Sequence, residues 1–485
     1  MINILLSLIL VFLVSLNNLY IFQLQYYEAK RFIKVKLQNI NYYYLLYLPF
    51  AILSVYYNNP SFTLGSIILF AYLILLLDKK DQMSSLKFTF RIYRLIALIL
   101  LVSLLILFNV NKLYLLRLFL LIIFNPLLIL ICNVIDLNYR VIINIIMKNK
   151  LKHKLKKINP LIIGITGSYG KTSTKRYLES ILKLKYNVLT PKGNINTYKG
   201  VVNYLNKNLT PLTQVLIIEI GLDKKNGINK FLKLFKFDYS FLTGIEKCHL
   251  STFKSIENII NEKMKLIKNS KLGFINIDNN YLKETEYNTY SLNDLDYLEY
   301  KNNIMSFKIK NINKEFKTSI VGDQHILNII GVIKFLTIFK FDEELIYQGV
   351  IKLKNESHRY EIKKINELLI IDDAYNSNAT SFRYAIDSLK YFNQKKVLIT
   401  PGVIELGEEN EITNYNLGLY IINNVDEVIL IGLNSLSIEK AFIDNQYSNY
   451  QYFETFKEGF NYLKSKQDKD FITLIENDLP DYYLN

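Results

Sequence analysis

The sequence predicts an α-helical membrane region followed by two α/β domains. Three observations carry this prediction. The first 140 residues contain five long apolar stretches with few charges inside them. Residues 158–340 alternate between β-branched apolar runs and segments with helical periodicity, as in a doubly wound sheet. Residues 360–485 repeat that alternation, with LLIID, VLIT, EVILIG and FITLIE as buried strands, and predict a Rossmann-like C-terminal domain.

The chain length agrees with this organisation, since 485 residues leave room for roughly three domains. We expect a membrane domain at 1–140 and a basic linker at 141–157. A central domain follows at 158–355 and a C-terminal domain at 356–485.

The apolar stretches predict about five transmembrane helices, at 2–24, 43–58, 61–77, 93–109 and 114–135. A helix needs about 20 apolar residues to cross a bilayer, within a range of about 17–25. The first, fourth and fifth stretches fit best. The second is short and contains Pro49, but the tyrosines at both of its ends suit the membrane interface. The alternative, buried helices of a soluble domain, is disfavoured because the charges fall almost entirely in the loops.

The charges of the loops predict an orientation. Lysines and arginines are concentrated after the first, third and fifth stretches, whereas the loops after the second and fourth are almost uncharged. The positive-inside rule then places the N-terminus outside and everything after residue 136 in the cytoplasm. The first stretch lacks a basic leader and a small-residue cleavage site, so we interpret it as an anchor and not as a signal peptide.

The overall composition excludes some classes of protein. The formal net charge is +16, but no basic stripe with interleaved aromatic residues suggests nucleic-acid binding. Lys, Asn, Ile and Tyr are abundant throughout, as AT-rich coding often gives, and an anionic inner membrane surface is a second explanation for the excess positive charge. Cys132 and Cys248 form neither a disulfide framework nor a zinc motif, in agreement with a reducing compartment.

A phosphate-binding loop is predicted in GITGSYGKTSTKRYLESIL, residues 164–182. A β-branched run leads into a glycine-rich turn and then into a helical pattern. Gly167 and Gly170 let backbone N–H groups approach phosphate oxygens, and the helix N-terminus adds its positive dipole end. Lys171 is placed to reach the terminal phosphates and Thr172 to ligate Mg²⁺. A nucleoside triphosphate is the expected ligand, although Ile165 stands where the strict motif has its first glycine.

The motifs that follow bring a resemblance to a family. TGSYGKTS resembles the T-G-[ST]-x-G-K-T-[ST] loop of the Mur ligases, which use ATP to add amino acids to the peptidoglycan precursor. In the family's order follow GNINTYKG (193–200), VLIIEIG (215–221), HLSTFKSIENIINEK (249–263), DDAYNSNATS (372–381) and GVIELGEE (402–409). The match covers about 160–480 and is closest to the D-alanyl-D-alanine-adding branch, MurF. It implies a P-loop ATPase-like central domain.

The resemblance implies a reaction. ATP phosphorylates a carboxylate, and an amine then attacks the acyl phosphate to form an amide. The implied substrates are UDP-N-acetylmuramoyl-tripeptide and D-Ala-D-Ala, with ATP and two Mg²⁺ as cofactors. The alternative is a related Mur-type ligase of another pathway, such as polyglutamate or other wall-peptide ligation, including a lipid-linked substrate. A transporter ATPase is disfavoured because its L-S-G-G-Q signature is missing.

The resemblance also implies roles for individual residues. The nucleotide-binding residues are Thr166, Gly167, Ser168, Tyr169, Gly170, Lys171, Thr172, Ser173, Asn328, Arg359 and Asp373. The metal-binding residues are Thr172, Glu219, His249 and Lys263, with Lys263 carbamylated. The implied catalytic residues are Lys171, Glu219, His249, Lys263 and Arg359. The substrate-binding residues are Asn194, Asn196, Thr197, Asn376 and Asn378.

The sequence departs from the family pattern at two places, and several of these residues also have an ordinary structural interpretation. Gln324 and His325 occupy positions where the family has His and Asn, and Ala379 replaces a proline. A strand-end glutamate, a lone histidine or a helical lysine is more often solvated or structural than metal-binding. The predicted partners are the nucleotide-sugar peptide, the D-amino-acid dipeptide and membrane lipid, without nucleic acid. The resemblance implies a bacterial cytoplasmic membrane, with the membrane region replacing the usual UDP-binding domain.

Overall fold

The structure is a computed structural model that divides into two units, Met1–Ile146 and Met147–Asn485, each of which is considered by itself. It describes residues 2–38, 49, 52–53, 65–69, 86–108, 113–193, 195–222, 224–247, 250–282, 286–355, 357–365, 367–375, 377–404, 406–466 and 470–477.

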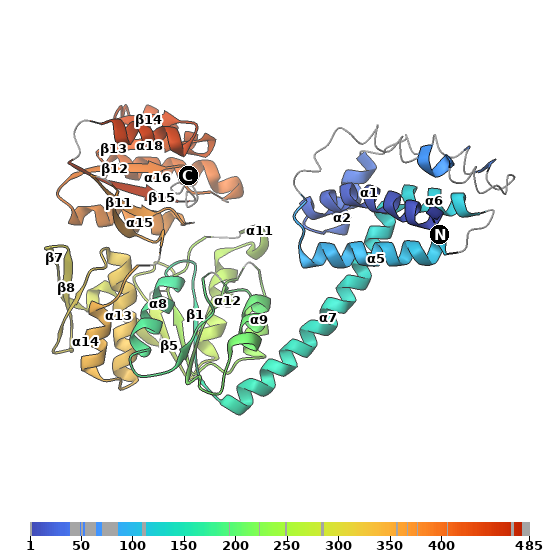
Figure 1. Cartoon of the computed structure of the whole chain (residues 1–485). Coiled ribbons are helices and arrows are strands. Elements are labelled where there is room, and N and C mark those ends of the chain that lie inside the picture. The colour runs from blue at the N-terminus through green and yellow to red at the C-terminus, as the bar shows by residue number, and fades with distance from the viewer. Residues whose placement is uncertain are drawn as a thin grey trace. The chain divides into compact units, whose positions relative to one another are not determined.

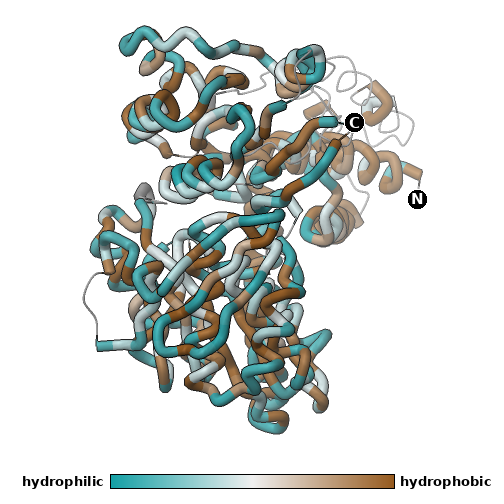
Figure 2. The backbone as a smooth tube through the Cα atoms, turned by 90° about the vertical axis from the view of Figure 1, so that its left-hand side faces the viewer, coloured by the Kyte–Doolittle hydropathy of each residue, from teal (hydrophilic) through white to brown (hydrophobic). Residues whose placement is uncertain are grey.

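The N-terminal unit is helical and apolar (Figures 1 and 2). Its described helices are α1 (Ile2–Leu24), α2 (Ala29–Gln38), α5 (Phe90–Leu107), α6 (Tyr114–Ile123) and α7 (Asn125–Ile158), the last of which continues into the second unit. Among the described residues, α1, α5 and α7 are long and apolar enough to cross a membrane. The predicted spans at 43–58 and 61–77 lie largely outside the described residues.

The predicted span at 114–135 is divided in the structure. The chain leaves the helix at Phe124 and begins α7 at Asn125, so that α6 has only 10 residues. Pro126 explains the break, because proline lacks an N–H and its ring clashes with the carbonyl four residues earlier. By contrast, the basic segment 141–157, predicted as a linker, is helical throughout as part of α7.

Buried polar side chains tie the apolar helices together. Asn18 on α1 donates to the Asn125 side chain at 2.9 Å, and Asn125 donates to the Ser15 hydroxyl at 2.8 Å. Tyr114 on α6 donates to the Ser7 hydroxyl at 2.9 Å. These contacts satisfy groups that would be costly to bury alone, so they fix which faces of the helices meet.

The central domain is built on a parallel sheet with the strand order β2-β3-β1-β4-β5-β6. Its strands are β1 (Leu161–Thr166), β2 (Val188–Leu189), β3 (Val215–Glu219), β4 (Tyr239–Leu242), β5 (Leu272–Asn276) and β6 (Asn288–Tyr290). Every pairing in it is parallel. The predicted doubly wound α/β domain is confirmed.

Helices cover both faces of this sheet (Figure 1). One face carries α8 (Lys171–Leu182), α13 (Asp323–Ile338) and α14 (Glu343–Ile351). The other carries α9 (Tyr198–Asn208) and α10 (Gly227–Leu232), together with side chains of α12 (Ile256–Lys268) and of the last turns of α7. Because both faces are covered, the strands are almost continuously apolar, as the sequence indicated.

A three-stranded antiparallel sheet was not predicted. It consists of β7 (Leu295–Lys301), β8 (Ile304–Ile309) and β9 (Glu315–Thr318). Asn302 and Asn303 connect β7 to β8, and both have positive φ angles, of 52° and 62°. Two such residues between strands form the hairpin turn whose twist matches that of its strands. The Asn-Asn pair was therefore the signal in the sequence.

The C-terminal domain has a mixed sheet, which corrects the Rossmann-like prediction. The strand order is β10-β11-β15-β12-β13-β14, and β10 (Glu361–Ile365) is antiparallel to β11 (Leu368–Asp373). Only two residues separate these strands, which is too short for a parallel crossover. The other pairings are parallel, through β12 (Lys395–Thr400), β13 (Glu427–Ile431), β14 (Tyr450–Phe453) and β15 (Phe471–Glu476).

The helices of the C-terminal domain also lie on two faces. Side chains of α15 (Ala379–Asp387), α16 (Asn410–Ile422) and α17 (Leu436–Asp444) belong to the core shared with the central domain. Those of α18 (Phe456–Ser465) pack in a separate cluster on the other face of the sheet. The carboxyl ends of β1, β3, β11 and β15 carry Thr166, Glu219, Asp373 and Glu476, and the carboxyl edge is where open α/β sheets bind ligands.

Candidate functional site

The predicted phosphate loop connects β1 to α8. β1 ends at Thr166, whose side chain is buried, and α8 begins at Lys171. Gly170 has a φ of 73°, and a Cβ atom there would lie 3.0 Å from the Asn328 side-chain oxygen. Both the backbone angle and the close approach of α13 therefore require glycine at this position.

Residues after β4 and β5 hold the loop in place. The Ser168 N–H donates to the Gly244 carbonyl at 2.8 Å, and the Glu246 N–H donates to the Ser168 hydroxyl at 2.9 Å. The Thr243 hydroxyl donates to the Tyr169 carbonyl, and the Asn279 amide donates to the Tyr169 hydroxyl at 2.9 Å. The loop is thus fixed from the side opposite to its open face.

Lys171 and Thr172 begin α8 at the open face of the loop. The Lys171 ammonium donates to the carbonyls of Gly167 and Ser168, at 2.8 and 3.2 Å. The Thr172 hydroxyl lies 3.2 and 3.3 Å from the two carboxylate oxygens of Glu219, at the end of β3. A lysine, a hydroxyl and a carboxylate therefore meet at a helix N-terminus, a favourable place for an anion and its metal counter-ion.

Glu219 takes part in a buried ion pair that the sequence did not reveal. Lys175, with a fully buried side chain, places its ammonium 2.9 Å from a Glu219 oxygen. The same ammonium donates to the Gly193 carbonyl at 2.9 Å, and the Asn196 amide donates to Glu219 at 3.2 Å. Burial raises the pKa of Glu219, but the charges of Lys175 and Lys171 outweigh it, so its pKa is lowered overall. Glu219 is thereby kept ionised.

A signal for Lys175 was present in the sequence. It lies one helical turn after Lys171, on the face of α8 that also carries Leu178 and Leu182, which are buried. A lysine on a buried helix face is rare unless it is paired. Glu219 is the only acidic residue of the neighbouring strand β3. This reasoning could therefore have predicted the ion pair between Lys175 and Glu219.

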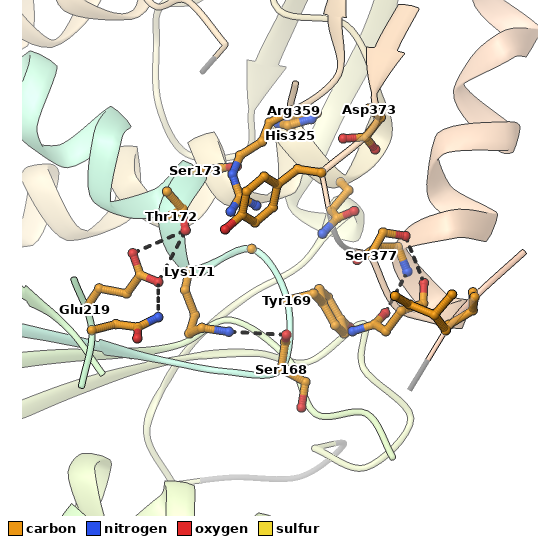
Figure 3. A pocket seen from close by; sticks show the side chains of 18 of the residues that line it. Ser168, Tyr169, Lys171, Thr172, Ser173, Glu219, His325, Arg359, Asp373 and Ser377 are labelled. Carbon is orange, nitrogen blue, oxygen red and sulfur yellow. Dashed lines mark hydrogen bonds between the residues drawn. The ribbon is translucent and has the colours of Figure 1, made fainter. Parts of the chain in front are cut away.

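The main cavity, about 320 Å³ in volume, lies between the loop and the C-terminal domain (Figure 3). Arg359 and Asp373 line it from the C-terminal side, together with Tyr375, Ser377 and Asn378. The Arg359 guanidinium lies 4.3 Å from the centre of the Tyr375 ring. Lys171 and Arg359, cationic residues from the two domains, therefore line one cavity.

His325 contributes a neutral group to the main cavity. It lies in the first turn of α13, and its Nδ1 atom is 2.8 Å from the Tyr177 hydroxyl. Burial lowers the pKa of His325 to about 4, and the positive charge of Arg359 lowers it further in the same direction. The imidazole is uncharged at neutral pH. It therefore offers hydrogen bonds and a flat surface and adds no charge.

Asp373, which is half-buried, and Glu476, which is fully buried, form a carboxyl pair at the ends of β11 and β15. Asp373 accepts from the Tyr360 N–H at 3.0 Å, and Glu476 accepts from the Ser377 hydroxyl at 2.5 Å. Burial raises the pKa of Asp373 to about 6 and raises that of Glu476 well above its usual range. Repulsion between the two carboxylates adds to this rise for Glu476, so this pair holds a proton near neutral pH.

A second cavity, about 430 Å³ in volume, lies on the other side of the loop. Lys263 on α12 lines it, with only 3% of its surface exposed. Asn196, Lys224 and Lys230 also line this cavity. Three lysines and an amide are suited to a ligand that carries carboxylates or phosphates. Gly167, Ser168 and Lys171 line it as well, so the loop separates the two cavities.

The structure brings many of the predicted residues together. The main cavity is lined by Ser168, Tyr169, Gly170, Lys171, Thr172, Ser173, Asn196, Glu219, Arg359, Asp373 and Asn378. The second cavity is lined by Gly167, Asn196, Thr197 and Lys263. Two of these residues also cap helices: Thr197 accepts from the Gly200 N–H and Asn378 from the Ser381 N–H.

Other predicted residues lie elsewhere. Thr166 is buried at the end of β1, and its hydroxyl is 3.5 Å from the Ile220 carbonyl. Asn328 is buried behind Gly170, whereas Gln324 and His325, one turn earlier on α13, line the main cavity. Asn194, His249 and Asn376 lie outside the described residues.

The described residues fit a magnesium ion in part. The Thr172 hydroxyl and the Glu219 carboxylate are oxygen ligands of the kind that Mg²⁺ binds. Within the described part of the chain, no three His, Cys, Asp or Glu side chains gather as a metal cluster. Mg²⁺ is usually bound through one or two carboxylates, with phosphate oxygens and water completing its coordination, so this donor set suits a metal that arrives with a nucleotide.

These features define a two-domain α/β protein with a phosphate loop facing a cavity shared by both domains. Residues 165–336 match the Mur ligase middle domain, and residues 358–475 match the glutamate ligase domain of Mur ligases. The chain belongs to the Mur ligase family.

Similar proteins come from several bacteria. A Bacillus subtilis protein named UDP-N-acetylmuramoyl-tripeptide–D-alanyl-D-alanine ligase is 29% identical over 303 residues, covering 58% of this chain and 65% of that protein. The Borreliella burgdorferi protein of the same name is 29% identical over 331 residues, covering 64% and 71%. The match thus spans just under two thirds of the Bacillus subtilis relative.

Solved structures share the fold of the second unit. MurF from Acinetobacter baumannii has a TM-score of 0.62 at 20% identity, covering 68% of this chain and 76% of that one. MurF from Thermotoga maritima, in complex with ADP, has a TM-score of 0.61 at 22% identity, covering 68% and 79%. The mixed C-terminal sheet and the parallel central sheet therefore form a known pair of domains.

Proposed function

We propose that this protein is an ATP-dependent ligase that joins a carboxylate to an amine through an acyl phosphate. The observation that carries the proposal is the meeting of Lys171, Thr172 and Glu219 with Arg359 in one cavity. The Thermotoga maritima structure, which shares the fold, is a complex with ADP and so supports an adenine nucleotide as a ligand.

The residues of the main cavity suit transfer of a phosphoryl group. The loop N–H groups and Lys171 hold the terminal phosphates, and Arg359 supplies positive charge from the other domain. Thr172 and Glu219 would hold Mg²⁺, which would supply further positive charge to the phosphate oxygens when bound. The γ-phosphoryl group passes from ATP to the acceptor carboxylate, and ADP leaves. The amine then attacks the acyl carbon, and the carbon–oxygen bond to phosphate breaks as the amide forms.

The proposed acceptor is UDP-N-acetylmuramoyl-tripeptide, and the proposed amine is D-Ala-D-Ala. The names of the Bacillus subtilis and Borreliella burgdorferi relatives support this pair. The second cavity supports an anionic acceptor, because Lys224, Lys230 and Lys263 line it beside the loop. We place the acceptor there, with Asn196 and Thr197, and the amine on the C-terminal side with Asn376 and Asn378.

The buried Lys263 supports a second metal position. Its side chain lines the second cavity and is almost fully buried, and a buried lysine is costly unless its charge is balanced or removed. We propose that Lys263 is carbamylated and, with His249, holds a second Mg²⁺. Carbamylation converts an ammonium into an anion, which is the sign of charge that a metal ligand needs.

A substrate-dependence experiment tests the proposed reaction. We expect phosphate release from ATP to require both UDP-N-acetylmuramoyl-tripeptide and D-Ala-D-Ala, because the acyl phosphate forms on one substrate and is resolved by the other. The measurement is phosphate release by the full chain in detergent, with each substrate omitted in turn. Release with another carboxylate and amine, but not with this pair, would move the enzyme to a related pathway, such as polyglutamate ligation.

The N-terminal unit supports a location in the bacterial cytoplasmic membrane. Three of its described helices have the length and composition of membrane spans. We propose a multi-pass protein with its N-terminus outside and its catalytic domains in the cytoplasm, where ATP is available. This arrangement would place the ligase beside the membrane steps of cell-wall synthesis, and membrane lipid would be a partner.

Membrane fractionation tests this location. We expect the full chain to stay with the membrane pellet after washing at alkaline pH and high salt, because apolar helices leave a bilayer only with detergent. The control is a chain that begins at residue 147, which we expect in the soluble fraction. Release of the full chain by the alkaline wash would contradict a spanning location.

A further inference from the structure

An arginine cluster lies in the N-terminal unit, where the first turns of α5 pack beside the interior of α7. It consists of Arg91 and Arg94 on α5 and Arg140 on α7, gathered around Asp136. The Nε atoms of Arg94 and Arg140 are each 2.8 Å from an Asp136 oxygen, and that of Arg91 is 3.7 Å away. The Asp136 side chain is fully buried. Three guanidinium groups therefore share one carboxylate.

The cluster has more positive charge than its surroundings neutralise. Asp136 balances one of the three arginines, which leaves two charges in excess. The other acidic residue among the described positions of this unit, Glu28, pairs with Arg31 at 2.8 Å. The segment 70–85, outside the description, has two acidic and two basic residues and so adds no net charge. Excess positive charge on partly buried arginines beside apolar helices is costly without an anion.

Some guanidinium donors of the cluster also lack acceptors. Arg91 donates from Nη2 to the Asn133 side chain at 2.9 Å. In the described part of the chain, Arg91 Nε and Arg140 Nη2 are buried without a hydrogen bond, whereas Arg140 Nε lies 2.8 Å from Asp136 Oδ2 in an ion pair that is not aligned as a hydrogen bond. A phosphate group, with several acceptor oxygens, suits such forked donors better than a second carboxylate would.

Aromatic residues place the cluster at a membrane interface. The Arg91 guanidinium lies 3.5 Å from the centre of the Tyr27 ring, and that of Arg94 lies 5.5 Å from the Tyr139 ring. Tyr139 is exposed, as is Tyr93, one residue before Arg94. Exposed tyrosines mark the headgroup level of membrane proteins. Exposed apolar side chains flank the cluster on α7, so acyl chains have a surface next to the charges.

We propose that the arginine cluster binds the phosphate group of an anionic membrane lipid. The proposal rests on the membrane location proposed above, because only a lipid presents its phosphate at headgroup level beside an apolar surface. Asp136 then has two roles. It holds the three arginines together, and it competes with the lipid phosphate for their guanidinium groups. Removing its charge should strengthen lipid binding, whereas a purely structural carboxylate would give no such gain.

A titration of the full chain in a nonionic detergent tests the proposal. The probe is a fluorescent short-chain phosphatidic acid, with diacylglycerol and inorganic phosphate as comparators. We expect Arg94→Gln to weaken lipid binding by about tenfold and Arg94→Lys by a few fold, since lysine keeps the charge but loses the fork. Arg31→Gln, the matched control, removes the same charge from an exposed pair and should change binding by less than about twofold.

The Asp136→Asn variant gives the sharpest result. We expect it to bind phosphatidic acid several-fold more tightly than the unmodified chain, with inorganic phosphate far weaker for both. Equal binding by the unmodified chain, Arg94→Gln and Arg94→Lys would overturn the assignment. If inorganic phosphate bound as tightly as phosphatidic acid, the proposal that the bound phosphate belongs to a lipid would be overturned. Fractionation tests the membrane location independently. A chain that stays in the membrane fraction but does not bind phosphatidic acid would therefore refute the lipid-binding role of the arginine cluster and leave the membrane location intact.

Discussion

Lys171→Ala is expected to lower the rate of ATP-dependent phosphate release by at least about 10³-fold. The ammonium group lies at the open face of the loop, within hydrogen-bonding distance of the Gly167 and Ser168 carbonyls. In the proposed reaction it stabilises charge on the transferring phosphoryl group, and loss of one such preorganised donor costs about 10²–10³ in rate. Loss of phosphate binding adds to that effect.

The measurement is steady-state phosphate release with both substrates present. Lys183→Ala is the matched control, because Lys183 follows the same helix but pairs with Glu179 at 2.6 Å, away from the cavities. We expect its rate to stay within about twofold of the unmodified chain. A Lys171→Ala rate within tenfold of the unmodified chain would show that the loop does not hold the transferring phosphates.

Much of the central domain could be predicted from the sequence because its signals are local. The β-branched runs, the glycine turn and the helical pattern after Lys171 lie within about 20 residues of one another. The loop geometry depends on Gly170, whose backbone angle and close approach to Asn328 both favour glycine. The order of the family motifs then predicted that Glu219 and Asp373 belong to the same site as this loop. In the structure, both residues line one cavity with the loop.

The features that were missed include two local signals, a short connection and a proline, and one helix rotation. A two-residue connection makes β10 antiparallel and turns an expected Rossmann-like sheet into a mixed one. Pro126 divides the predicted span at 114–135, although hydropathy alone shows one apolar run. Asn328 lies behind the loop because α13 enters with Gln324 and His325 towards the cavity, a rotation that a sequence pattern does not fix.

The buried Lys175–Glu219 pair is expected to govern the stability of the central domain. Lys175→Met should lower the free energy of unfolding by about 3–5 kcal/mol, because it leaves the Glu219 carboxylate buried with hydroxyl and amide partners alone. Glu219→Gln should destabilise as well, because Lys175 would keep only the carbonyls of Pro191 and Gly193. The measurement is urea unfolding followed by circular dichroism, since the chain has no tryptophan.

The double variant tests whether Lys175 and Glu219 stabilise the domain as a pair or independently of each other. Lys175→Met with Glu219→Gln should be less destabilised than the sum of the single variants, by about 1–3 kcal/mol, because neither change then leaves an uncompensated buried charge. Lys183→Met removes an exposed lysine at the end of the same helix, while Glu179 keeps Arg176 as a partner, so it should cost less than about 1 kcal/mol. Strict additivity would contradict the pairing. If the pairing holds, Lys175 is what keeps a carboxylate charged beneath the phosphate loop, where a metal ion can share it.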